Sequence, residues 1–259
     1  MSPIDPRALA HLDTRRLCLV FQEIGGEIAP LAGGWMACDI PGSWARYAVG
    51  IGLDSLPSSA ELDTLEDYYV DRGCPPTIQL SDHHHPDMPA LLSDRGFAIT
   101  DREVVLGRRL DGELPRASPV DGLVLREVDP HDDEDVEAFV RAQIIGFDAP
   151  EGLIPITRRV GRGARWTVLL AELHGEIIGS CGIEPYETLS VLIAGAVFPQ
   201  ARRRGVQSQM ITTRLHLARA QGAEIVTVGS VLGGPTARNA ARFGFAPLYE
   251  LTEWTKPLP

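Results

Sequence analysis

The residues whose types and spacing suggest chemistry lie in the segment AVFPQARRRGVQS, residues 196–208. An apolar run that ends at Phe198 predicts a buried strand, and a loop with three arginines and Gly205 follows it. An amphipathic helix is expected to begin near Gln207. Helix-start N–H groups and the helix dipole attract anions, and arginines add charge-assisted hydrogen bonds. The segment therefore predicts a site for a phosphate-bearing ligand, with a basic solvated turn as the alternative.

The loop resembles motif A of the GCN5-related N-acetyltransferases, the GNAT superfamily, whose pattern Arg/Gln-x-x-Gly-x-Gly/Ala holds the pyrophosphate of acyl-coenzyme A. It stands here as Arg202-x-x-Gly205-x-Gln207, so the second glycine position departs from the pattern. GNATs part the preceding strand from its neighbour to admit the thioester, and Gly195 inside this strand predicts a bulge or a close backbone approach. The resemblance implies these cofactor-binding residues: Ala196, Val197, Phe198, Arg202, Arg203, Arg204, Gly205, Val206, Gln207 and Ser208.

A second segment, residues 224–245, is similar to motif B of the same family. A short β-rich run is followed by a helix that begins at Pro235 and ends before Gly244. The form Asn-Ala-x-Arg-x-Gly-Phe implies that Asn239 contacts the cofactor, whereas a solvated amide on the helix surface is the alternative. The resemblance covers residue 123 to the C-terminus.

The implied chemistry is acyl transfer from acyl-CoA, most simply acetyl-CoA, to an amine of a small molecule or peptide. Glu184 and Glu187, just before the cofactor strand, are candidates for the base, with a solvated hairpin loop as the alternative. A backbone N–H near Val197 would stabilise the oxyanion. Ala240 stands where many GNATs carry a tyrosine that protonates the leaving thiolate. Tyr249 is the replacement candidate for this acid, or it packs on the final strand.

The order of elements in residues 61–110 recurs from Met210 onward: helix, strand, loop, helix and strand. The glycines that end the two helices have almost equal spacing in both copies, and Phe follows the second glycine each time. We interpret this as two GNAT-like α/β halves in tandem, each with a mixed sheet. The boundaries are 1–112 and 121–259, with a polar linker between them. Residues 52–59, just before the helix of the first half, contain no arginine, so this half is expected to have lost the cofactor.

The composition of the chain limits the classes of partner that we expect. A net charge of −11 over 259 residues argues against nucleic acid, and no apolar run is long enough to span a membrane. The N-terminal segment lacks the features of a signal peptide. Four cysteines without close pairs indicate a reducing, cytoplasmic setting and no disulfide frame. The run His83-His84-His85 is interpreted as a loop, so no metal is expected, and homodimerisation stays open.

Two other functions remain as alternatives. Because of Ala240 and Gln207, the chain is alternatively a non-catalytic acyl-CoA-binding or regulatory protein. The tandem arrangement also allows an aminoacyl or peptide transferase of tandem-GNAT type, although the sequence pI of about 5.1 argues against binding of charged tRNA.

Overall fold

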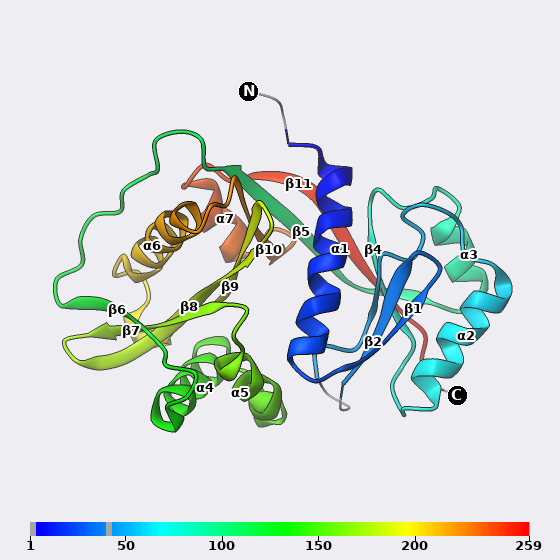
Figure 1. Cartoon of the computed structure of the whole chain (residues 1–259), viewed down its shortest axis with the longest axis horizontal. Coiled ribbons are helices and arrows are strands. Elements are labelled where there is room, and N and C mark those ends of the chain that lie inside the picture. Colours follow the sequence, from blue (N-terminus) through cyan, green and yellow to red (C-terminus); the bar gives the residue numbers. More distant parts are fainter. Residues whose placement is uncertain (1–3, 40–42, 259) are drawn as a thin grey trace. The chain divides into compact units, whose positions relative to one another are not determined.

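The computed structural model describes residues 4–39 and 43–258. The chain divides into two compact units (Figure 1). The first contains the residues up to Val105, Ser230–Gly234 and the residues from Pro247 onward, and the second contains Leu106–Gly229 and Pro235–Ala246. Most of the final strand therefore groups with the first unit, which differs from a division of the chain at the linker. The α/β fold class with a mixed sheet is confirmed.

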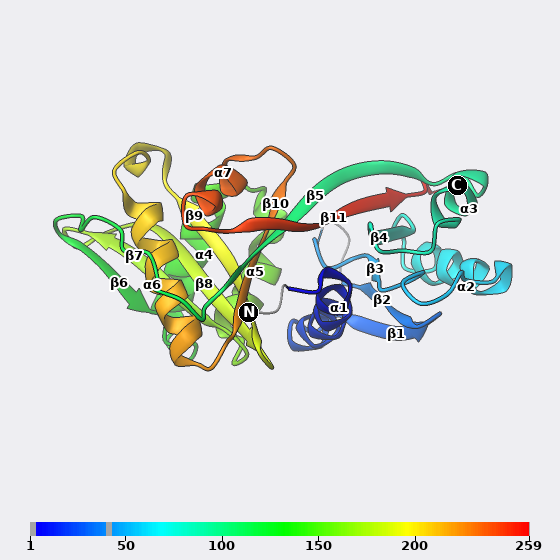
Figure 2. The same cartoon turned by 90° about the horizontal axis from the view of Figure 1, so that it is seen from above.

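The first unit combines a sheet with helices placed before and between its strands (Figure 2). Strands β3 and β4 are parallel and are joined through α2, and the C-terminal β11 pairs antiparallel with β4. Strand β5 (Ala98–Arg109) begins in this unit. The other elements are α1 (Pro6–Glu23), β1 (Glu27–Leu31), β2 (Gly34–Cys38), β3 (Ala48–Val49), α2 (Ser59–Val70), β4 (Thr77–Ser81), α3 (Met88–Asp94) and β11 (Ala246–Thr255).

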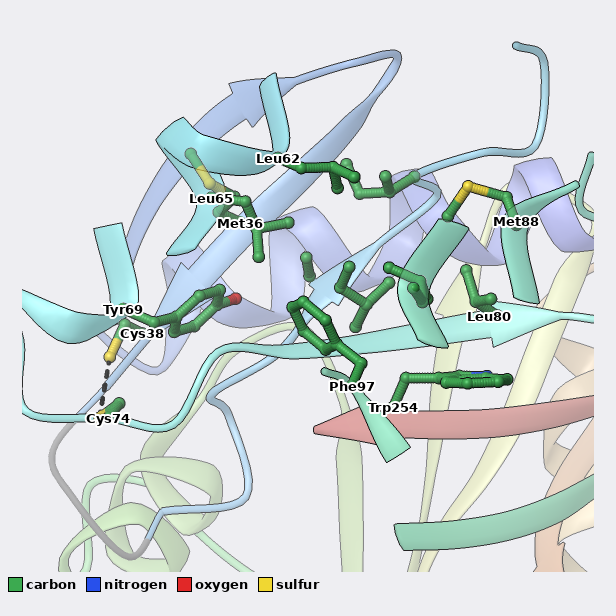
Figure 3. Close-up of a cluster of buried hydrophobic side chains, with 14 residues drawn as sticks. Met36, Cys38, Leu62, Leu65, Tyr69, Cys74, Leu80, Met88, Phe97 and Trp254 are labelled. Carbon is green, nitrogen blue, oxygen red and sulfur yellow. Dashed lines mark hydrogen bonds between the residues drawn. The ribbon is translucent and has the colours of Figure 1, made fainter. Parts of the chain in front are cut away.

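The core of the first unit lies between its sheet and the helices α2 and α3 (Figure 3). Leu62 and Leu65 of α2 and Met88 of α3 are fully buried against strand residues. Trp254, from the last strand of the chain, belongs to the same cluster. The C-terminal strand thus completes the hydrophobic core of a unit that is built mostly from the first 105 residues.

Two cysteines that are far apart in the sequence meet in this core. The Sγ atoms of Cys38 and Cys74 are 3.3 Å apart, and both thiols are free and buried. Burial and the neighbouring Cys74 raise the pKa of the Cys38 thiol to about 12. The thiolate is the reactive form, and the raised pKa keeps Cys38 as the thiol near neutral pH.

The second unit is built on the strands β6 to β10. Strands β6, β7, β8 and β9 pair antiparallel in succession, and β10 pairs parallel with β9. The bounds are β6 (Leu123–Glu127), α4 (Asp133–Phe147), the 3-10 turn Glu151–Leu153, α5 (Ile154–Arg162), β7 (Thr167–Leu173), β8 (Glu176–Tyr186), β9 (Leu189–Val197), the 3-10 turn Pro199–Ala201, α6 (Val206–Ala220), β10 (Ile225–Val231) and α7 (Pro235–Ala241).

Helices cover both faces of this sheet (Figure 1). On one face, Val206 and Met210 of α6 pack on Leu169, Ala171 and other strand residues in one buried cluster. On the other face, α4 contacts β8 and β9. The two units share one topological element, because β3–α2–β4 and β9–α6–β10 are each a parallel strand–helix–strand unit. This common element agrees with the tandem interpretation of the sequence.

The polar segment between the halves is held along α6. Gln209 donates through Nε2 to the Ser118 carbonyl at 2.6 Å, and Arg219 donates to the Gly112 carbonyl at 3.2 Å. Val120 packs against the buried cluster under α6. The segment is therefore part of the second unit rather than a free linker.

Replacing Trp254 with alanine tests whether the last strand completes the core of the first unit. Trp254→Ala removes a large side chain that is 8% exposed, and we expect a loss of about 3–5 kcal/mol in the free energy of unfolding. Equilibrium urea unfolding followed by circular dichroism measures it. Leu258→Ala, at a position 41% exposed, is the control and should change stability little. Equal, small effects of both changes would contradict this assignment of the strand.

Candidate functional site

The basic loop leads into a helix whose N-terminus has no cap. Gly205 is the N-cap residue of α6, with φ +82° and no side chain to accept a hydrogen bond. The first bond of the helix runs from the Gln209 N–H to the Gly205 carbonyl at 3.1 Å. The N–H groups of Val206, Gln207 and Ser208 lie ahead of that bond and have no partner within the helix. They form the type of N–H cluster that binds phosphate oxygens.

A cavity of about 760 Å³ opens at this helix start. Most of the residues that the sequence assigned to the cofactor line it. They are Ala196, Val197, Arg202, Arg203, Gly205, Val206, Gln207, Ser208 and Asn239. Phe198 and Arg204 are not among the lining residues. The structure thus brings the two sequence motifs together around one cavity, although it contains no ligand and leaves their roles as predictions.

Further lining residues escaped the sequence analysis. Gly146 and Phe147 come from the end of α4, and Pro235, Thr236 and Arg242 come from α7 and the turn after it. The guanidinium of Arg242 donates to Asn239 Oδ1 at 2.6 Å, so it orients the predicted amide. The sequence carried no local signal for these residues, because tertiary packing brings the end of α4 and the start of α7 to the cavity.

Strand β9 carries a bulge close to its end. The register with β8 shifts between Ser180 and Gly182, so that two residues of β9, Ala194 and Gly195, lie opposite one residue of β8. Ala194 has φ +54°, and its carbonyl accepts a hydrogen bond from Gln143 Nε2 at 2.8 Å. The bulge that Gly195 predicted is therefore present, and α4 fixes it through Gln143.

Strands β9 and β10 part before the bulge. Their parallel pairing runs only from Leu189–Ile225 to Val191–Thr227. Beyond these pairs the strands leave a gap lined by Leu192, Ala194, Gly195, Val228 and Gly229. A second cavity of about 140 Å³ occupies this gap and shares Phe147, Gly195, Gln207 and Thr236 with the larger one. The site is thus one continuous path from the α6 N-terminus into the parted sheet.

The backbone at the end of β9 presents polar groups to the gap. The Phe198 N–H donates to the Ile178 carbonyl of β8 at 2.8 Å, so Phe198 faces β8. Successive residues of a strand alternate in direction, and the N–H and carbonyl of Val197 therefore point to the opposite side. Arg202 Nε donates to the Val197 carbonyl at 3.0 Å on that side, and Val197 lines the larger cavity, so its N–H is a donor next to that cavity.

Arg202 acts as a brace in this site. Besides Val197, it donates through Nη2 to the Gly146 carbonyl at 3.0 Å. One guanidinium thereby joins the end of β9 to the last turn of α4. Arg203, with φ +63°, is the loop arginine that lines the cavity without such a brace. The three arginines thus have different positions: a brace, a lining cation and, at Arg204, an exposed side chain outside the lining.

The structure separates the three residues predicted to carry catalysis from the cavity lining. Glu184 lies within β8, is 2% exposed, and faces Arg165 Nη2 at 3.8 Å. It is therefore a buried strand residue, and the alternative of a solvated loop holds only for Glu187 in the turn, where φ is +51°. Neither glutamate lines either cavity of the site.

Tyr249 is in the part of β11 that groups with the first unit. Its hydroxyl donates to Asp13 Oδ2 at 3.4 Å, and burial, with the Asp13 charge, raises the pKa of its phenol well above the ordinary value. It lines a cavity of only about 20 Å³ in that unit. The prediction that Tyr249 protonates the leaving thiolate gains no support from this position, and its alternative, packing on the final strand, describes what is observed.

A protein-family model, that of the acetyltransferase (GNAT) family, matches residues 132–245. These residues contain α4, α6 and α7, and also the part of β9 that lines the two cavities. Residues 132–245 form a GNAT domain. The match includes both sequence motifs, so the resemblance seen in them is confirmed. A search of curated proteins found no match to this sequence.

Solved structures share the fold of this chain along nearly its whole length. A GCN5-related N-acetyltransferase from Kribbella flavida has a TM-score of 0.73 at 16% identity, with coverage of 95% of this chain and 96% of that one. One from Sphaerobacter thermophilus has a TM-score of 0.65 at 17% identity and covers 90% and 77%. A tandem GNAT protein from the clavulanic acid biosynthesis pathway has a TM-score of 0.57 at 15% identity and covers 94% of both.

The described residues hold no cluster of three or more His, Cys, Asp or Glu arranged to bind a metal ion. The histidine run, residues 83–85, lies between β4 and α3 as a loop, as expected. None of the described helices combines the length and the apolar character needed to cross a bilayer.

A glycine substitution tests the geometry of the helix start. Gly205→Ala places a Cβ at φ +82° and 3.1 Å from Val120 Cγ2, and we expect about tenfold weaker binding of coenzyme A. Gly222→Ala is the control, because φ is +88° there and no atom lies within 4 Å of the added Cβ. Both variants carry the strain of about 1–2 kcal/mol, but only the first alters the cavity. Calorimetry that gives equal affinities for both would exclude the Gly205 loop as the binding site.

Proposed function

We propose that this GNAT protein transfers an acyl group from acyl-CoA, most simply acetyl-CoA, to an amine of a small molecule or peptide. The observation that carries the proposal is the uncapped N-terminus of α6 at the mouth of a path that continues into the parted strands. The anionic pyrophosphate suits the N–H cluster and Arg203. The extended pantetheine arm suits a path between two strands, since its amides can bond to free strand groups.

This placement sets the direction of the cofactor. With the pyrophosphate at Val206–Ser208, the thioester lies in the gap beside the bulge of β9. The amine nitrogen attacks the thioester carbon and the C–S bond breaks. The Val197 N–H is the proposed donor to the oxyanion that forms. The thiolate leaves with its electron pair without a dedicated acid, because a thiol pKa of about 8.5 makes it a good leaving group near neutral pH.

Binding without turnover is the second candidate. The observation that favours it is Ala240, which is 2% exposed. It lines the inner cavity, which is the cavity of about 140 Å³ in the gap between β9 and β10. A tyrosine at that position would place a hydroxyl in the cavity, whereas alanine supplies no proton donor. Turnover with a panel of polyamines, amino acids and peptides separates the two, because a binding protein consumes no acetyl-CoA.

Two neighbouring arginines allow a matched test of cofactor binding. We expect the unaltered protein to bind acetyl-CoA in the micromolar range, about −8 kcal/mol. Arg203→Glu removes a lining cation and should weaken binding by at least about tenfold, since a charged hydrogen bond contributes about 1.5–3 kcal/mol. Arg204→Glu makes the same change of net charge outside the lining and should have little effect. Calorimetry in which the two variants bind alike would contradict the assignment.

The base is tested by the pH dependence of the rate. We propose a carboxylate at Glu184 or Glu187, and Glu184 is the buried one, on the strand adjacent to β9. Its replacement by Gln should lower the rate by about 10²–10⁴-fold at neutral pH, with partial recovery at high pH where the amine loses its proton unaided. Glu187→Gln is the matched change at the exposed turn. Wild-type rates from neutral to alkaline pH in both variants would mean that neither residue is the base.

A further inference from the structure

The inner cavity contains a charged residue that the proposed reaction does not use. Arg214 of α6 lines this cavity and is 4% exposed. Its hydrogen-bond partners are backbone carbonyls: Nε donates to Met210 at 3.0 Å, and Nη1 donates to Gly182 at 3.3 Å and Ile193 at 3.2 Å. Arg214 therefore lies under the β8–β9 pair, immediately before the bulge.

No carboxylate balances this charge among the residues that the structure describes. Arg214 takes part in none of their ion pairs, and the group that acts on its charge is the buried Cys181 thiol. Burial lowers the pKa of the Arg214 guanidinium below its ordinary value because the cation has lost water. A buried charge without an ion pair is costly even when carbonyls accept its hydrogen bonds, and an anionic group of a ligand would offset that cost.

The free end of the guanidinium points to the gap between the strands. Nη2 forms no hydrogen bond within the described part of the chain, whereas Nε and Nη1 are both used. It lies 3.5 Å from the place where a Cβ of residue 195 would be, and Gly195 has none. The glycine at the bulge thus leaves the guanidinium in direct contact with the space that the proposed acyl group enters.

The cavity is larger than an acetyl group needs. A methyl group takes about the space of one water molecule, which needs roughly 10–15 Å³ on the scale on which the inner cavity has about 140 Å³. Most of the remaining side chains of the wall are apolar, namely Leu192, Ile211, Val228, Ala240 and Phe245, and the polar Gln207 and Thr236 also line the larger cavity. A short methylene chain that ends in one anionic group matches apolar walls with a single buried cation.

We propose that Arg214 binds a carboxylate at the far end of the acyl chain, so that the donor is the CoA thioester of a short dicarboxylic acid, such as succinyl-CoA. This inference rests on the proposed acyl-CoA-dependent function and names its acyl class. The balance of the reaction is unchanged: the amine nitrogen forms the bond to carbon, the C–S bond breaks, and the amine proton passes to base. The product is an amide that keeps a free carboxylate.

The test compares succinyl-CoA with butyryl-CoA, whose chain has the same number of carbons without the carboxylate. Calorimetry on the full chain should show succinyl-CoA binding at least about tenfold more tightly, as expected for a charge-assisted hydrogen bond in a desolvated site. In Arg214→Met this ratio should fall to about one. A purely structural Arg214 would weaken both thioesters by one factor and keep their ratio. Equal binding of the two thioesters by the unaltered protein would overturn the proposal.

Controls separate the remaining outcomes. Arg219→Met removes the same charge from the exposed end of α6 and should keep the ratio. If Arg214→Met does not fold, the ratio of the succinyl-CoA and butyryl-CoA affinities is measured in Arg214→Lys and compared with that of the unaltered protein. Absence of binding of coenzyme A itself would sink the proposed function together with this inference, whereas coenzyme A binding without a preference for succinyl-CoA would sink this inference alone.

A carboxylate could also belong to the acceptor, and a kinetic arm distinguishes the two sources. With acetyl-CoA saturating, kcat/KM is compared for an amino acid and its amide, in the unaltered protein and in Arg214→Met. We expect Arg214→Met to leave the ratio of the two acceptors unchanged. A preference for the free amino acid that Arg214→Met abolishes would place the carboxylate on the acceptor and overturn the acyl assignment.

Discussion

The proposed site depends on the N-terminus of α6, whose first N–H groups receive no side-chain cap. The comparison with α2, in the equivalent strand–helix–strand element of the first unit, makes this clear. At α2, Ser58 Oγ accepts from the Glu61 N–H at 3.3 Å, and the Glu61 carboxylate accepts from the Ser58 N–H at 2.7 Å. The capping box satisfies donors and brings its own negative charge. At α6, Gly205 offers neither, so the same element begins with uncapped N–H groups in one unit and with a capped helix start in the other.

The proposed site also needs a gap in the sheet, and this gap lies between β9 and β10. An open seam in a sheet leaves backbone groups without ladder partners, and side chains must hold its edges. Three residues do so here: Gln143 binds the Ala194 carbonyl, Arg202 binds the Val197 carbonyl, and Arg214 binds the Ile193 carbonyl. They come from α4, from the loop and from α6, so the elements around the sheet determine the width of the gap. The loop arginine that a sequence pattern associates with phosphate thus has a bracing role in the strand.

The sequence predicted the features that depend on local signals. The loop 202–208, the bulge at Gly195 and the helix at Pro235 follow from neighbouring residues, and the structure contains all three. Features that depend on long-range packing could not be predicted. The grouping of β11 with the first unit needs its pairing with β4, and the proximity of Cys38 and Cys74 needs a folded core. The sequence left open a solvated hairpin loop at Glu184, but β8 extends to Tyr186 and Glu184 is buried within it.

The central claim is that the α6 N-terminus, and not that of α2, receives the pyrophosphate of coenzyme A. Backbone amide chemical shifts, measured by NMR while coenzyme A is added, test this claim directly. We predict large, saturable shifts for the amides of Val206, Gln207 and Ser208, because they would donate to phosphate oxygens. The amides of α2 from Ser59 to Glu61 should not move. Unchanged amides at the start of α6, or shifts that appear at the start of α2 instead, would contradict the account.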